Sequence, residues 1–160
     1  MAHTAPRPLI GLLAGVAAGL VASAAMAAFQ ATAARLVDSD DDDDPATVKA
    51  ADRVSEAATG APVPDAHREQ AGQAVHYLVG AALGGIYGVI AEYRPATTSG
   101  FGGAYGLVTS LLFDEAAVPA AGLGAPPWQA SLASHAYGLA SHLTYGFALE
   151  STRALLAGRR

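Results

Sequence analysis

The sequence contains no cysteine and few charged residues, which make up 14% of its 160 positions. The lack of cysteine excludes disulfide bonds, thiolate metal sites and cysteine nucleophiles. Basic residues do not gather into a patch, so no nucleic-acid partner is expected. The net charge of −5 comes largely from an acidic run at residues 40–44. It therefore describes one loop rather than a surface that selects a partner.

Hydrophobic residues are abundant, at 52% of the chain, and the mean hydropathy is positive although residues 30–69 form a strongly polar loop. Apolar segments at about residues 9–29, 70–91, 95–118 and 131–149 are each long enough to cross a hydrocarbon core of about 30 Å. We therefore predict one all-α membrane domain over residues 1–160, a polytopic bundle of four transmembrane helices in contact with the lipid bilayer.

The first apolar segment has a second interpretation. Its small residues Ala25 to Ala28 are compatible with cleavage of a signal peptide. The apolar core of a signal peptide is normally shorter, about 7 to 15 residues. The length of the segment and its glycines favour a retained helix.

Each of the four segments carries a small residue at every fourth position, interrupted in three of them by His, Asp or Glu. The rows are Gly11, Gly15, Gly19, Ser23; Gly72, His76, Gly80, Gly84, Gly88; Gly102, Gly106, Ser110, Asp114; and Ser134, Gly138, His142, Gly146, Glu150. In water each helical glycine would cost about 1 kcal/mol relative to alanine. In a bilayer, small residues let helix backbones approach closely. These rows are predicted to form the helix contacts, and the scarcity of bulky side chains predicts a homo-oligomer or a subunit of a membrane complex.

The polar loop contains one predicted helix of its own. Apolar residues recur at helical spacing over residues 46–59, after Asp44 as N-cap and Pro45 as first helical residue, and Gly60 closes the segment. We expect a short amphipathic helix on the membrane surface, followed by an extended stretch. Trp128, in the Pro-rich loop before the last span, is expected to anchor that loop at the interface.

The distribution of Lys and Arg predicts the orientation. Arginines flank both termini and the loop between the second and third spans, whereas the third loop has no basic residue. By the positive-inside rule both termini are cytoplasmic, and the polar loop faces outward.

Ionisable residues inside the predicted spans form the candidate site. At about 1.5 Å rise per residue, His76, Asp114, Glu115 and His135 are expected at similar depths near the outer surface. His142 is expected nearer the middle of the membrane. Intramembrane ionisable residues are commonly functional.

Three interpretations of this cluster stay open. Imidazole and carboxylate are ligands for Zn, Mn or Fe. They also suit a proton relay or pH sensor, because His titrates near neutral pH. A purely structural hydrogen-bond cluster is the third. No spacing decides among them, so no cofactor is assigned and any metal is left unknown.

Other features carry less weight. Glu92 with Arg94 and Glu150 with Arg153 are expected as ion pairs at the inner surface. The motif of Tyr87, Gly88 and Glu92 recurs as Tyr145, Gly146 and Glu150, which a duplicated helix hairpin could explain. No nucleophile and base pair is evident, so no catalytic residue is assigned and the chain is not expected to be an enzyme.

Three segments carry a family resemblance: Gly84 to Pro95 (GGIYGVIAEYRP), Gly122 to Trp128 (GLGAPPW) and His142 to Arg153 (HLTYGFALESTR). They resemble the YagU-like inner-membrane proteins, an uncharacterised family associated with bacterial acid resistance. The resemblance covers roughly residues 70–156 and the position of the first span. It implies a bacterial inner-membrane protein that contributes to survival at low pH, without supplying a mechanism. The Asp-rich loop departs from the loop expected of the family.

Overall fold

The computed structural model describes residues 5–33 and 44–158, and over these residues the fold is all-helical, as predicted. Its α-helices are α1 (Pro8–Ala33), α2 (Ala46–Thr59), α3 (Arg68–Tyr93), α4 (Gly103–Leu112), α5 (Val118–Ala120) and α6 (Leu132–Ala157). Short 3-10 turns lie at Asp65–His67, Pro95–Thr98 and Pro127–Gln129, and a π-helical segment, Phe113–Ala117, joins α4 to α5. Most of the acidic run, residues 40–43, lies outside the described residues.

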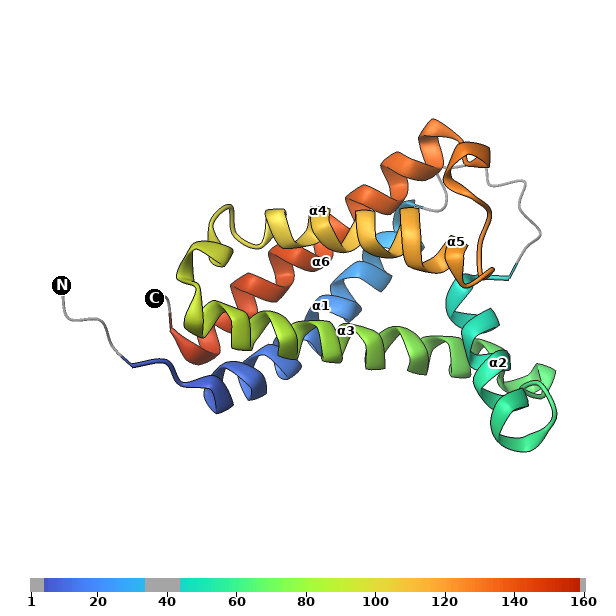
Figure 1. Cartoon of the computed structure of the whole chain (residues 1–160), viewed down its shortest axis with the longest axis horizontal. Coiled ribbons are helices and arrows are strands. Elements are labelled where there is room, and N and C mark those ends of the chain that lie inside the picture. Colours follow the sequence, from blue (N-terminus) through green and yellow to red (C-terminus); the bar gives the residue numbers. More distant parts are fainter. Residues whose placement is uncertain (1–4, 34–43, 159–160) are drawn as a thin grey trace.

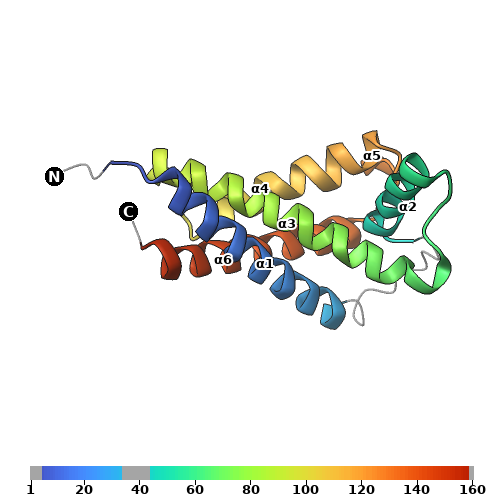
Figure 2. The same cartoon turned by 90° about the horizontal axis from the view of Figure 1, so that it is seen from below.

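The long helices run between two ends of the molecule (Figures 1 and 2). We call the end that holds the start of α1 and the end of α6 the terminal end. At the opposite end, the loop end, α2 lies across α3 and α5 leads into the loop before α6 (Figure 1). The α1 helix packs against α3 and α6, and α4 packs against α6.

Glycines bring α1 and α3 into backbone contact. A β-carbon at Gly15 would overlap the carbonyl oxygen of Gly84, and one at Gly19 would overlap that of Gly80. At Gly11 the nearest atom would be the carbonyl oxygen of Gly88, at 2.5 Å. Only glycine allows this approach, so these glycines of the first two rows form the contact between α1 and α3.

The second helix pair, α4 and α6, repeats this arrangement. Gly102 lies against Gly146, and Gly106 lies against the backbone of His142. Gly146 of the recurring Tyr-Gly motif therefore makes the same kind of contact as Gly88 does in the first pair. The helices of each pair are antiparallel. In both pairs, successive contacts lie four residues later along one helix and four residues earlier along the other.

The third predicted span begins later than expected. The helix starts at Gly103 instead of near Pro95, because a 3-10 turn and a tight turn intervene. Gly102, at φ +80°, adopts a left-handed conformation in that turn and also touches Gly146, which fits only glycine.

The helix over residues 46–59 has the predicted bounds and ends at Gly60 in a left-handed conformation. The predicted N-cap is wrong, because Pro45 occupies that position and the Asp44 side chain binds Arg68 at 2.7 Å instead. Arg68 also donates to Asp52 at 2.6 Å, which fastens α2 to the start of α3. This hydrogen bond from the Arg68 guanidinium lowers the pKa of the Asp52 carboxyl.

The interior is made mostly of small and polar residues, with Leu149 fully buried among them, and most of the large aliphatic side chains lie outside. Buried side chains include Ala18, Ala22, Ser23, Tyr87 and Ser141, whereas Leu78 on α3 is 70% exposed. Within the described residues two helices, Pro8–Ala33 and Asp65–Tyr93, are long and apolar enough to cross a membrane. Both features are consistent with a membrane protein.

Candidate functional site

The π-helical segment Phe113–Ala117 carries both predicted carboxylates, Asp114 and Glu115. The backbone N–H of Val118 donates to the carbonyl of Phe113, five residues back, so the segment holds one more residue per hydrogen-bonded turn than an α-helix. Single π turns inside α-helices are rare and are frequently found at functional sites. Here the segment faces two histidines of α6.

Asp114 binds His142. Its Oδ2 lies 3.1 Å from His142 Nδ1 and accepts a hydrogen bond of 3.0 Å from Ser110 Oγ. A β-carbon at Gly138 would lie 2.8 Å from the same oxygen, so this glycine makes room for the carboxylate. His142 Nδ1 also lies 3.1 Å from the carbonyl oxygen of Gly138. Because both neighbours of Nδ1 are acceptors, Nδ1 carries a proton.

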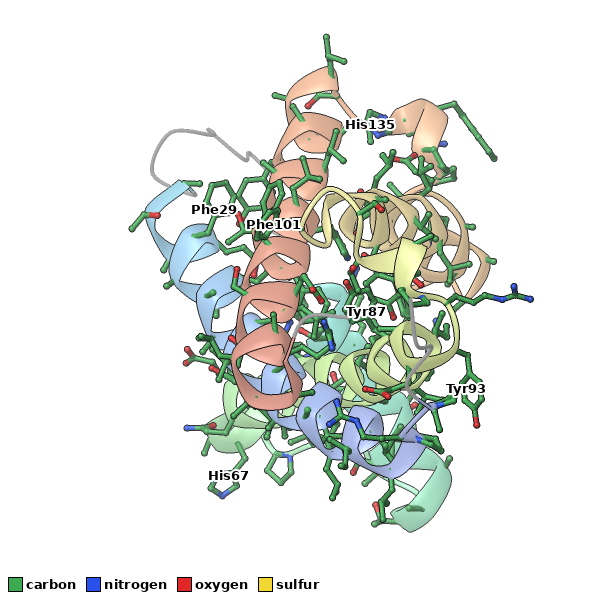
Figure 3. All side chains as sticks on the ribbon, turned by 90° about the vertical axis from the view of Figure 1, so that its left-hand side faces the viewer. Phe29, His67, Tyr87, Tyr93, Phe101 and His135 are labelled. Carbon is green, nitrogen blue, oxygen red and sulfur yellow. The ribbon has the colours of Figure 1, made fainter. Side chains whose placement is uncertain are left out.

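Glu115 binds His135. The Glu115 Oε1 atom lies 2.7 Å from His135 Nδ1, and His135 Nε2 lies 3.1 Å from the carbonyl oxygen of Pro127. Both ring nitrogens thus face acceptors, and only the doubly protonated imidazolium can donate to both. Figure 3 shows His135 at the edge of the bundle beside the loop that precedes α6.

The predicted cluster is divided in the structure. His76 Nε2 lies 3.2 Å from the carbonyl oxygen of Ser23, and its ring meets that of Tyr77 edge to face. His142, expected nearer the middle of the membrane, is the partner of Asp114. Among the described residues no three His, Asp or Glu side chains lie close enough together to hold a metal ion. Metal binding therefore gains no support from the geometry.

Two cavities meet at the Asp114–His142 pair. The first, about 360 Å³, lies among α1, α2, α3, the π-helical segment and α6, and His76 also lines it. The second, about 760 Å³, lies at the loop end and is lined by Glu115 and His135. Asp114 and His142 line both cavities, as do Met26, Gln30 and Val118, so the pair lies where the two cavities adjoin.

A second polar cluster lies toward the terminal end. Arg153 donates to both carboxylate oxygens of Glu150, at 2.7 and 2.9 Å, and Tyr87 donates to Glu150 at 2.9 Å. The predicted Glu150–Arg153 pair is thus present, but it is buried, with Arg153 only 2% exposed. The hydroxyl of Tyr87 is a partner that sequence reasoning missed. Figure 3 shows Tyr87 between the helices.

Glu92 has a different partner from the one predicted. Its Oε2 accepts a hydrogen bond of 2.7 Å from the backbone N–H of Arg7, and its Oε1 lies 3.6 Å from the Arg7 guanidinium. Arg7 also donates to the carbonyl of Ala157 at 2.7 Å. These contacts join the start of α1 to the ends of α3 and α6.

Comparison of the chain with family models, curated proteins and solved structures finds no match. The resemblance to YagU-like proteins stays a prediction from the sequence, as do self-association and the absence of catalysis. What the chain does must be argued from its own geometry.

Proposed function

We propose that the chain is a four-span protein of the bacterial inner membrane with both termini in the cytoplasm. Exposed aliphatic residues support the third and fourth spans, since Val108 and Leu111 of α4 and Leu132 and Leu155 of α6 are all more than half exposed. The continuous helical stretch at residues 103–120 is about 27 Å long at about 1.5 Å per residue. This nearly matches a hydrocarbon core of about 30 Å.

Within this bundle, we propose a pH-responsive contact between the π-helical segment and α6. The observation that carries the proposal is the presence of two His–carboxylate pairs, Asp114–His142 and Glu115–His135, on the same two elements. Each pair gains a full charge attraction when its His is protonated and loses it when the carboxylate is protonated. Mild acidification would therefore strengthen the contact, and stronger acidification would release it.

The two cavities beside the Asp114–His142 pair leave space for the π-helical segment and α6 to move relative to each other. A local charge change has a global effect only when it biases an element with two arrangements. A π-helical segment that can bind or release α6 is such an element. Survival at low pH, the role implied by the resemblance to YagU-like proteins, is the cellular function we propose for it.

The test is the distance between the two elements as a function of pH. Because the chain has no native cysteine, spin labels can be attached at Leu112→Cys and Leu132→Cys without background. In reconstituted protein, we expect the label distance to change between pH 8 and pH 4. The combined change His135→Gln and His142→Gln should abolish the response.

His67→Gln is the matched control, since His67 is exposed at the loop end and belongs to neither pair. This variant should respond as the wild type does. A distance that is constant with pH in the wild type, or that changes equally in the double variant, would reject the proposed function.

A further inference from the structure

The smaller cavity has the size and lining of a small-molecule site. Its volume of about 360 Å³ lies within the range of about 300–1,000 Å³ typical of ligand pockets. Apolar side chains, including Met26, Val79, Leu83 and Phe113, form most of its wall. Pockets of this kind bind a ligand's apolar body and select it through a few polar groups.

The polar groups converge on one part of the wall. Asp114, His142 and His76 line the cavity, as does Ser23. The side chain of Ser23 is fully buried, and its hydroxyl has no hydrogen-bond partner among the described residues. A buried hydroxyl without a partner costs about 1–3 kcal/mol, so the wall of the cavity holds one polar group whose hydrogen bonding is not satisfied by the described residues.

The charge of the lining selects the ligand. The ionisable side chains that line the cavity are His76 from α3, Asp114 from the π-helical segment, and His142 and Tyr145 from α6. The lining residues of α1 and α2 are not ionisable. With neutral imidazoles, the site carries one negative charge, on Asp114.

A carboxylate at the edge of an apolar cavity interacts strongly with a single positive charge, because the local dielectric constant is low. Phe113 and Tyr145 line the same space, and aromatic rings attract cations. We propose that this cavity binds a lipophilic organic monocation, with its charge against Asp114, in competition with the proton of His142. The competition rests on the proposed function, whereas cation binding itself does not.

Competition between the proton of His142 and the cation predicts how the affinity for the cation depends on pH. A proton on His142 and a cation beside Asp114 would both neutralise the same carboxylate, so each weakens the binding of the other. Cation binding should release protons, and lowering the pH should weaken cation binding.

The probe is tetraphenylphosphonium, a lipophilic monocation, and tetraphenylborate is a control of nearly the same shape and opposite charge. Binding to the detergent-solubilised full chain is measured at pH 8 by equilibrium dialysis. We expect saturable binding of the cation, at least tenfold weaker in Asp114→Asn and unchanged in Asp65→Asn, an exposed carboxylate at the loop end. Equal cation binding by wild type and Asp114→Asn, or saturable binding of the anion at the same site, would overturn the proposal.

A second pair of variants guards against misfolding of Asp114→Asn. Val79 lines the cavity, whereas its neighbour Leu78 is not among the lining residues. Val79→Phe should fill the cavity and reduce cation binding at least tenfold, and Leu78→Phe should bind as the wild type does. Wild-type binding by Val79→Phe would place the cation elsewhere and overturn the assignment.

The outcomes separate this inference from the proposed function. A pH-dependent label distance without saturable cation binding would refute the ligand site and leave the pH response standing. Cation binding that depends on Asp114 but is independent of pH, with a constant label distance, would support the site and refute the proton competition.

Discussion

Tyr87 on α3 donates a hydrogen bond of 2.9 Å to Glu150 on α6, although the two residues are 63 positions apart in the chain. Arg153 binds the same carboxylate in a bidentate pair. The hydroxyl therefore joins two helices at a charge pair that is almost completely enclosed. The negative charge of Glu150 is balanced by the positive charge of Arg153, and Tyr87 donates a further hydrogen bond to the carboxylate. This balance explains how the bundle tolerates both charges in its interior.

Removing the arginine should destabilise the bundle strongly. Arg153→Met leaves the Glu150 carboxylate buried without its cation, and such a loss costs about 3–5 kcal/mol. Unfolding in detergent should show this decrease, and the added change Glu150→Leu should recover much of it. If the single and double variants are equally unstable, the pair is not the cause.

The tyrosine hydroxyl should contribute less. Tyr87→Phe removes one hydrogen bond to a charged group, worth about 1.5–3 kcal/mol. Tyr93→Phe is the control on the same helix, because Tyr93 is 56% exposed. Tyr87→Phe should have a clearly lower free energy of unfolding than the control. Equal stability of the two variants would contradict the role of this hydrogen bond.

Because the backbones of α1 and α3 are in contact, replacing Gly84 by alanine should destabilise the bundle more than replacing its neighbour Gly85. In Gly84→Ala the new methyl group meets the backbone of Gly15 and Gly19, which can yield only if the helices separate. Overpacking of this kind costs about 1–3 kcal/mol. In Gly85→Ala it meets the side-chain ends of Leu12 and Val16 at 3.0 Å, which can rotate away. Thermal unfolding should therefore show the larger loss for Gly84→Ala.

The attachment of α2 to α3 should depend on pH. The pKa of Asp52 is lowered by Arg68, so the folded state gains stability above the ordinary carboxyl pKa of about 3.9. That stability is lost as the pH falls through the lowered value. The protection of the α2 amides from hydrogen exchange, measured relative to the intrinsic exchange rate at each pH, should therefore be high at pH 7 and fall at pH 3. Asp52→Asn should show low protection in α2 at both pH values, and wild-type protection at pH 7 in this variant would contradict the prediction.

Replacing Gly138 should change the pH response of the Asp114–His142 pair more than the stability of the fold. A methyl group there lies 2.8 Å from Asp114 Oδ2, so Gly138→Ala should push the carboxylate away from His142. The pH at which the label distance changes should shift, while unfolding changes little. An unchanged pH profile would show that the pair tolerates the displacement.

Much of the helical architecture could be predicted because it is local. The length of the apolar segments predicts the long helices, and Gly60 predicts where the helix over residues 46–59 ends. The four-residue spacing of the glycines predicts which faces of the helices are in contact. The pairing of Asp114 with His142 could not be predicted from depth alone. Side chains on a helix point toward its N-terminus, and α4 and α6 run in opposite directions. Asp114 and His142 therefore lean toward each other from different heights.

The π-helical segment was also beyond sequence reasoning, because its backbone pattern has no residue signature in Phe113–Ala117. Nor could the burial of Arg153 be seen, since the hydroxyl that helps to enclose Glu150 comes from a distant helix. The repeated Tyr-Gly motif is the available signal, but it does not indicate that the hydroxyl of Tyr87 binds Glu150.

The π-helical segment holds one residue more than an α-helix would need over the same turn. Deleting a single residue there would restore the α-helical repeat, leave the helix from Val118 onward in place and change the direction of the side chains inside the segment. The direction in which Glu115 faces is thus set by the length of the chain as well as by its chemistry. Insertions and deletions, rather than substitutions, would be the simplest way for evolution to connect or disconnect His135.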